Sequence, residues 1–84
     1  MPYIQPHRRE SLAEGTTPSH SGELNYLITC VLVRYVKARG LHYETINDII
    51  GALEGAKLEF YRRVAVPYEN SKLATNGDVY NAPQ

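Results

Sequence analysis

Residues 45–64, TINDIIGALEGAKLEFYRRV, predict a long amphipathic helix around which the rest of the chain is organised. Successive residues of a helix lie about 100° apart, so one broad arc collects eight mostly apolar positions. They are Ile46, Ile49, Ile50, Leu53, Ala56, Phe60, Tyr61 and Val64. Thr45 is suited to cap the first turn, and Pro67 is expected to end the helix soon after Val64. We therefore expect this segment to bury its apolar arc against another helix.

The composition limits the class of protein. A chain of 84 residues with 43% apolar content fits one small domain, which buries only about 60% of the surface that the unfolded chain exposes. Nine basic and nine acidic residues cancel, so no net positive charge favours duplex DNA as a partner. Cys30 is the single cysteine, which excludes an internal disulfide and fits a reducing compartment.

The sequence shows no targeting or membrane signal. The first 20 residues contain early prolines and charges in place of the apolar run of a signal peptide. The longest mostly apolar stretch, residues 24–36, is shorter than the ~20 residues that cross a bilayer. We expect a cytoplasmic protein that does not bind membranes.

A first helix is expected from Ser21 or Gly22 to about Arg39, with Gly40 ending it. Its main apolar face comprises Leu24, Leu27, Ile28, Val31, Leu32, Tyr35 and Ala38. The connection to the long helix is short, which makes the two helices neighbours. The predicted fold class is therefore all-α, an antiparallel helical hairpin over residues 22–66 within a single domain, 1–84.

The reverse side of the first helix is also apolar. It carries Tyr26, Thr29, Cys30, Val33 and Val36. A helix that is apolar nearly all round is covered on both sides, whereas one neighbouring helix covers a single side. We therefore predict a homodimer in which two hairpins form a four-helix bundle, with Tyr26, Val33 and Val36 at the contact.

Gly51 and Gly55 lie on one side of the long helix, next to Ala52. A glycine costs a helix interior up to about 1 kcal/mol relative to alanine, so a compensating contact is expected. Close approach of a helix from a second copy is the favoured contact. A tyrosine, Tyr26 or Tyr35, lying across the glycines is a second interpretation, and a glycine side that faces solvent is a third.

The two ends are expected to be less regular. Residues 1–21 are read as an extended N-terminal arm with at most one helical turn, which docks through Tyr3 and Ile4 or else is a disordered leader. Residues 67–84 form a C-terminal tail with a turn at Asn76-Gly77. The Val79-Tyr80 pair in this tail either lies extended beside Tyr3-Ile4 or frays.

No pattern of residues indicates catalysis. The chain has no glycine-rich phosphate loop, and its three histidines lack the spacing of a zinc helix. We therefore expect a protein that is not an enzyme and that has no metal or cofactor.

Lys57 lies within the apolar arc of the long helix and needs an explanation. Its head group reaches water, pairs with Glu54 or Glu23, or completes an anion site with Tyr61, Arg62 and Arg63. Pairing of Glu59 with the two arginines is the structural alternative to that ligand site.

Several segments resemble a family of short proteins of unknown function from bacteria and their phages. The resemblance lies in MPYI at the start, GELNYLIT at 22–29, INDIIGALEGAKLEFYRRV at 46–64 and NGDVY at 76–80. It implies a small accessory protein that acts by binding, either to a host protein or to a signalling nucleotide. The function expected is a homo-oligomeric binding protein, and the alternative is a protein that sequesters a small anionic ligand.

Overall fold

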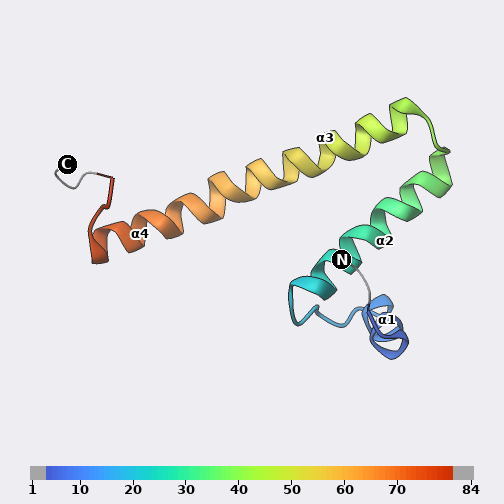
Figure 1. Cartoon of the computed structure of the whole chain (residues 1–84), viewed down its shortest axis with the longest axis horizontal. Helices are drawn as coiled ribbons and strands as arrows, with labels where there is room; N and C mark the ends of the chain where they lie inside the picture. The colour runs from blue at the N-terminus through green and yellow to red at the C-terminus, as the bar shows by residue number, and fades with distance from the viewer. Residues whose placement is uncertain (1–3, 81–84) are drawn as a thin grey trace. The chain divides into compact units, whose positions relative to one another are not determined.

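The computed structural model describes residues 4–80, which form helices and the loops between them. The helices are α1, Pro6–Ala13; α2, Ser21–Arg39; α3, Tyr43–Phe60; a π-helical turn η1, Tyr61–Ala65; and α4, Val66–Asn76 (Figure 1). No strand occurs within residues 4–80, so the all-α prediction is confirmed. The chain groups into two compact units, Met1–Asn47 and Asp48–Gln84.

Helix α2 has the bounds that the sequence predicts. At its start the Gly22 N–H donates a hydrogen bond of 3.1 Å to Nδ1 of His20, which satisfies one of the free amides of the first turn. At its end Gly40 adopts φ 89°, a conformation that residues with a side chain rarely take. The Gly40 N–H donates to the Val36 carbonyl at 2.7 Å and closes the last turn.

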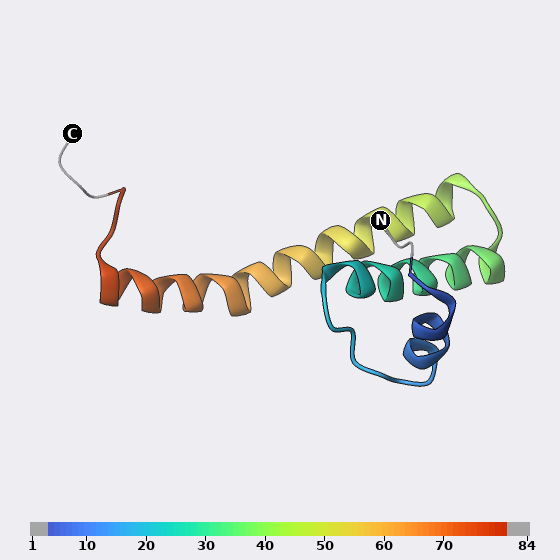
Figure 2. The same cartoon turned by 60° about the horizontal axis from the view of Figure 1, so that its bottom comes forward.

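Helix α1 corrects the prediction of an extended arm with at most one helical turn. Eight residues, Pro6–Ala13, are helical (Figure 2), and Arg8 of this helix pairs with Glu23 in the first turn of α2. Pro6 stands at the first helical position, where its missing N–H removes no hydrogen bond and its fixed φ suits a helix. The Gln5 carbonyl accepts from the N–H groups of Arg8 and Arg9 at 3.0 and 3.1 Å. An early proline therefore starts a helix here.

Of the two predicted anchors of the arm, Tyr3 and Ile4, the structure describes one. Tyr3 lies outside the described residues. Ile4 is half-buried, and its Cδ1 would lie 3.9 Å from a Cβ placed on Gly22 at the start of α2. The segment before α1 thus contacts the first turn of α2.

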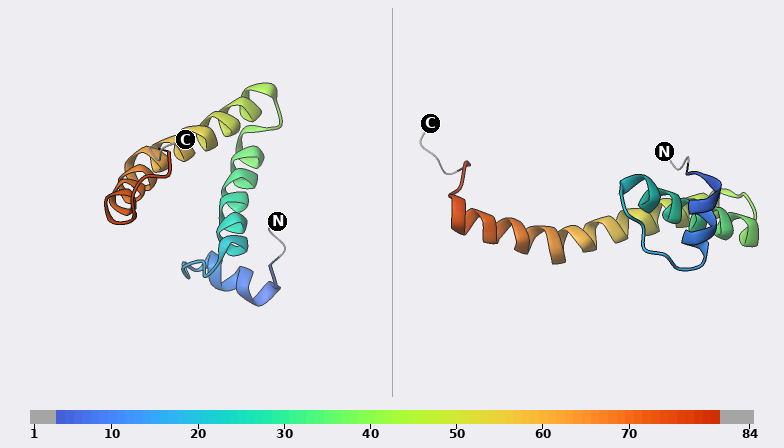
Figure 3. Two further views of the ribbon diagram at one scale, coloured as in Figure 1. Left: turned by 60° about the vertical axis from the view of Figure 1, so that its left-hand side comes forward. Right: turned by 90° about the horizontal axis from the view of Figure 1, so that it is seen from below.

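The long helix extends further than predicted, because Pro67 does not end it after Val64. The chain passes from α3 through η1 into α4 without a break (Figure 3). In η1 the Val66 N–H donates to the carbonyl of Tyr61, five residues back, which shifts the hydrogen-bond pattern by one residue. Pro67 then occupies the second position of α4, in a first turn where a missing N–H is tolerated.

Helix α3 also begins earlier than predicted. Tyr43 is its first residue, and the Ile46 N–H donates to the His42 carbonyl at 3.0 Å. Thr45 therefore lies inside the first turn, where it is 3% exposed, and does not cap the helix. The helix starts directly after the turn at residues 40–42, two residues before Thr45 in the sequence.

The Asn76-Gly77 signal is confirmed as the end of α4. Gly77 has φ 87°, and its N–H donates to the Leu73 carbonyl at 2.8 Å. Val79 and Tyr80 follow in a bend and a turn and are not extended, and Tyr3 of the predicted pairing lies outside the described residues. The Tyr80 N–H instead donates to Oδ1 of Asp78 at 2.9 Å.

Very little apolar surface is buried in either unit. Within residues 4–80 the one buried apolar side chain is Leu12 of α1, at 3% exposure. Each of the helices α2, α3 and α4 keeps large apolar side chains more than a third exposed. Within the described residues, no helix combines the length and the apolar character needed to cross a membrane.

Candidate functional site

The reverse side of α2, for which the sequence predicts a contact between copies, forms an open pocket. The pocket has a volume of about 320 Å³ and is lined by Tyr26, Thr29, Cys30, Val33, Arg34 and Lys37. We call these six residues the α2 groove. Val33, near its middle, is 46% exposed. Val36, the third predicted contact residue, lines an adjoining pocket with Leu32.

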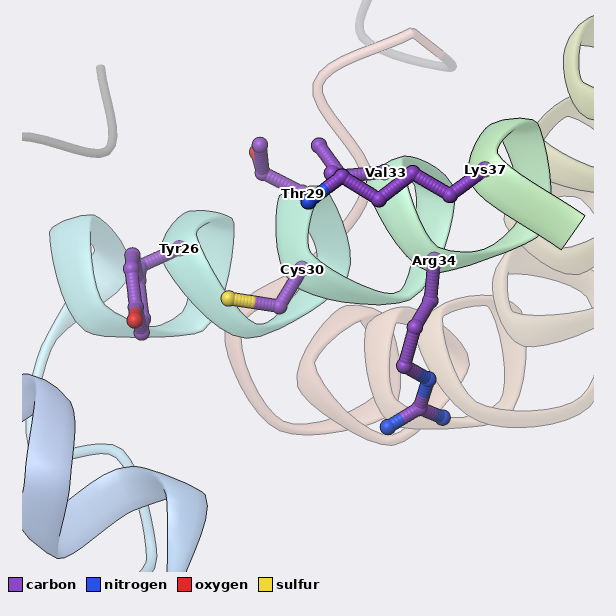
Figure 4. Close-up of a pocket in the computed structure, with 6 residues that line it drawn as sticks. All are labelled: Tyr26, Thr29, Cys30, Val33, Arg34 and Lys37. Atoms are coloured by element: carbon purple, nitrogen blue, oxygen red, sulfur yellow. The ribbon is translucent and has the colours of Figure 1, made fainter.

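Side chains of the α2 groove diverge from the helix in two rows. Tyr26, Cys30 and Arg34 leave on one side, and the sulfur of Cys30 points toward the Tyr26 ring (Figure 4). Lys37 runs back along the helix past Val33 in the direction of Thr29 (Figure 4). A hydrogen bond with the Cys30 side chain, together with burial, raises the pKa of Tyr26 above its ordinary value of 10.0. The groove thus has an apolar floor with positive charge along it.

Gly51 and Gly55 are open. A Cβ built on either glycine would meet nothing within 4 Å. What faces the two glycines stays a prediction: a helix of a second copy, Tyr26 or Tyr35, or solvent.

Within one chain, two cations of the predicted anion site are paired with glutamates. Lys57 makes an ion pair with Glu54 at 3.5 Å, one of the alternatives that the sequence leaves open. Arg62 makes an ion pair with Glu59. Tyr61 and Arg63 are exposed in η1. Two of the three cations are therefore neutralised by carboxylates of their own helix.

A second apolar surface lies on α4. Tyr68, Glu69, Lys72 and Leu73 line an open pocket of about 330 Å³ together with residues 76–80. The Lys72 ammonium lies 5.5 Å from the centre of the Tyr68 ring, a cation–π distance. Glu69 makes no ion pair with any of the residues 4–80. We call this surface the α4 face.

The most ordered polar cluster surrounds Glu23, in the first turn of α2. Arg8 of α1 donates two hydrogen bonds to its carboxylate, both of 2.6 Å. The backbone N–H and the hydroxyl of Ser19 donate to Oε1 at 2.9 and 3.1 Å. Nε2 of His20 lies 3.7 Å from Oε2. Since Glu23 is 3% exposed, this Glu23 cluster fastens α1 and the following loop to the start of α2.

The pairing shifts the titration of both partners. The hydrogen bonds from Arg8 first, and then the one from the Ser19 backbone, lower the pKa of Glu23 from 4.5 to about 2. The hydrogen bond to Glu23 raises the pKa of Arg8 above its ordinary value. Glu23 therefore stays ionised throughout the physiological range.

Sequence reasoning missed the Glu23 cluster, because the one partner it considered for Glu23 was Lys57. A signal was present, since a glutamate three residues after a helix N-cap commonly reaches back to the backbone before the helix. Its arginine partner comes from a helix that was not predicted. Within residues 4–80 no group of three His, Cys, Asp or Glu side chains is placed to hold a metal ion.

Comparison with known proteins gives one match. Residues 1–79 match a protein family described as "Domain of unknown function (DUF6899)". Neither the curated proteins nor the solved structures include a match.

Proposed function

We propose that this chain, which belongs to the DUF6899 family, is a non-enzymatic helical binding protein that acts as a homo-oligomer, with the dimer as the favoured form. The observation that carries the proposal is the exposed apolar surface of its helices. Leu12 is the one buried apolar side chain within residues 4–80, while Val33, Phe60 and Tyr68 are 46%, 64% and 61% exposed.

The exposed area is sufficient for a stable interface. An aromatic side chain that is half exposed leaves on the order of 100 Å² for a partner. In α3, η1 and α4, ten large apolar side chains are exposed by more than a third: Tyr43, Ile46, Ile50, Leu53, Leu58, Phe60, Tyr61, Val64, Tyr68 and Leu73. A standard protein interface buries roughly 800 Å² on each partner. A contact of that size between copies is within reach of this chain.

The arrangement that we propose is a pair of helical hairpins. Three residues separate α2 from α3, a connection length that is typical of antiparallel neighbours. Packing α3 on the main apolar face of α2 leaves the α2 groove for a helix of a second copy, and the two hairpins supply four helices to the dimer. The open glycine side of α3 is a second surface on which another helix can approach.

The alternative, a small anionic ligand such as a nucleotide held by Lys57, Tyr61, Arg62 and Arg63, has weaker support. Glu54 and Glu59 already neutralise two of the cations, and a bound anion would have to displace them. A host protein is the partner class that the resemblance to bacterial and phage proteins favours. The dimer would then present its remaining exposed side chains to that partner.

Light scattering at micromolar concentration tests the oligomer. We expect a mass twice that of the 9.5 kDa chain, and a smaller mass for Val33→Glu, which puts a charge into the α2 groove. Leu41→Glu is the matched control, because Leu41 lies in the loop and is 73% exposed. A wild-type chain that stays at 9.5 kDa would overturn the proposal.

A further inference from the structure

The lengths of the helices point to what covers the α2 groove. At 1.5 Å per residue, α2 with its 19 residues is about 28 Å long, and α3 with its 18 residues matches it. The helical run from Tyr43 to Asn76, however, reaches about 50 Å. In the hairpin of the proposed function, on which this inference rests, η1 and α4 therefore extend past the start of α2.

This extension cannot be covered by the α2 of its own chain, yet it is apolar. Tyr61, Val64, Tyr68 and Leu73 are between 45% and 61% exposed. Its length, about 24 Å from residue 61 to residue 76, nearly equals that of α2. One unpartnered helix and one unpartnered groove of similar length are thus present in every chain.

The charges of the two surfaces are complementary. Arg34 and Lys37 flank the α2 groove, and neither makes an ion pair within residues 4–80. Glu69 lies one turn before Leu73 on the α4 face and is likewise unpaired. The Lys37 side chain points along the groove toward Thr29 (Figure 4). Its ammonium can therefore pair with an acidic side chain of a helix that binds in the groove.

We propose that the α2 groove of each chain binds the α4 face of a second copy. A two-fold axis between the copies makes the exchange reciprocal and closed, so that each α2 lies between the α3 of its own chain and the α4 of its partner. In the proposed hairpin α4 runs antiparallel to the α2 of its own chain, so a two-fold axis perpendicular to the helices sets the partner's α4 parallel to α2. In that register Leu73 lies near Cys30 and Val33, and Glu69 lies near the Lys37 ammonium.

The single native cysteine provides a direct test. In Leu73→Cys, mild oxidation of the full-length dimer should join Cys30 of one chain to position 73 of the other, giving a covalent dimer on a non-reducing gel. Peptide mapping identifies the linkage. The double variant Cys30→Ser/Leu73→Cys is the matched control and should stay uncrosslinked.

The outcomes separate this inference from the proposed function. A dimer by light scattering without the 30–73 linkage overturns the docking and leaves the self-association standing. Crosslinking of the double variant would mean that two α4 helices pair with each other. A disulfide between positions 30 and 73 of one chain would mean that α4 folds back on its own α2. Either result also overturns the docking. A monomer overturns both proposals.

Charge reversal gives a second readout that needs no new cysteine. Lys37→Glu and Glu69→Lys should each raise the dissociation constant of the dimer by roughly three- to fivefold, as an exposed ion pair does. The combination Lys37→Glu/Glu69→Lys should restore most of the wild-type affinity. Additive losses in the combined variant would show that the two residues do not meet.

Discussion

Glu23 shows how one side chain organises the first unit. Its carboxylate accepts two hydrogen bonds from Arg8 and two from Ser19, so α1, the loop and α2 meet at one residue. A buried carboxylate without partners would be strongly destabilising. With four donors it fixes the position of α1, which otherwise contributes only Leu12 to the buried apolar side chains of residues 4–80.

Acid should release α1 through this residue. The pKa of Glu23 is about 2 in the folded chain against an ordinary 4.5, so protons bind more readily to the unfolded chain. The stabilisation by the Glu23 cluster is therefore complete above pH 4.5, decreases as the pH falls from 4.5 to about 2, and is lost below that. Thermal unfolding followed by circular dichroism across this window should show the decrease.

Glu23→Gln removes the titrating group and should unfold at a lower temperature than the wild type at pH 7, with the difference shrinking toward pH 2. Glu10→Gln is the matched control, because Glu10 is an exposed carboxylate of α1. Equal pH profiles for the wild type and Glu23→Gln would show that the cluster does not stabilise the fold.

At the scale of single elements, helix positions were easier to predict than helix ends. The bounds of α2 follow from its apolar periodicity and from Gly40, whose φ of 89° requires glycine. Two ends were wrong because proline was read only as a helix breaker. Pro6 and Pro67 both stand in a first turn, and Pro67 does so because η1 shifts the hydrogen bonds just before it.

The glycine side of α3 yields a prediction at this scale. Gly55→Leu should raise the helix propensity by somewhat under 1 kcal/mol, and the open space around Gly55 accommodates the side chain within one chain. We expect unchanged or higher helix content by circular dichroism, with weaker association by analytical ultracentrifugation. Gly55→Ala, with one methyl group, should weaken association less. If neither variant alters the association, the glycine side faces water and the α2 groove is the contact.

At the scale of the whole molecule, the apolar surface that a hairpin leaves uncovered could be predicted from Tyr26, Val33 and Val36 before any coordinates. The helix that covers this surface could not be predicted in the same way. We propose α4 for that place, and α4 exists because the helix continues past Pro67. Within one chain, Lys57 and Arg62 of the predicted anion site are paired, because each has a glutamate three residues before it. The pair of Glu59 with Arg62 is part of the structural alternative that the sequence offers for these charges.

If folding and association are linked, stability must depend on concentration. In the proposed dimer, a chain with one buried apolar side chain within residues 4–80 would gain most of its stability from the contact between copies, and binding of the native state shifts unfolding by mass action. Each tenfold increase in protein concentration should then stabilise the dimer by about 1.4 kcal/mol. Thermal melts at roughly 1, 10 and 100 µM should show a midpoint that rises with concentration, and Val33→Glu should melt at a lower temperature with a weaker dependence. A midpoint that is independent of concentration for the wild type would mean that single chains fold by themselves, and the helices would then have to cover one another within each chain.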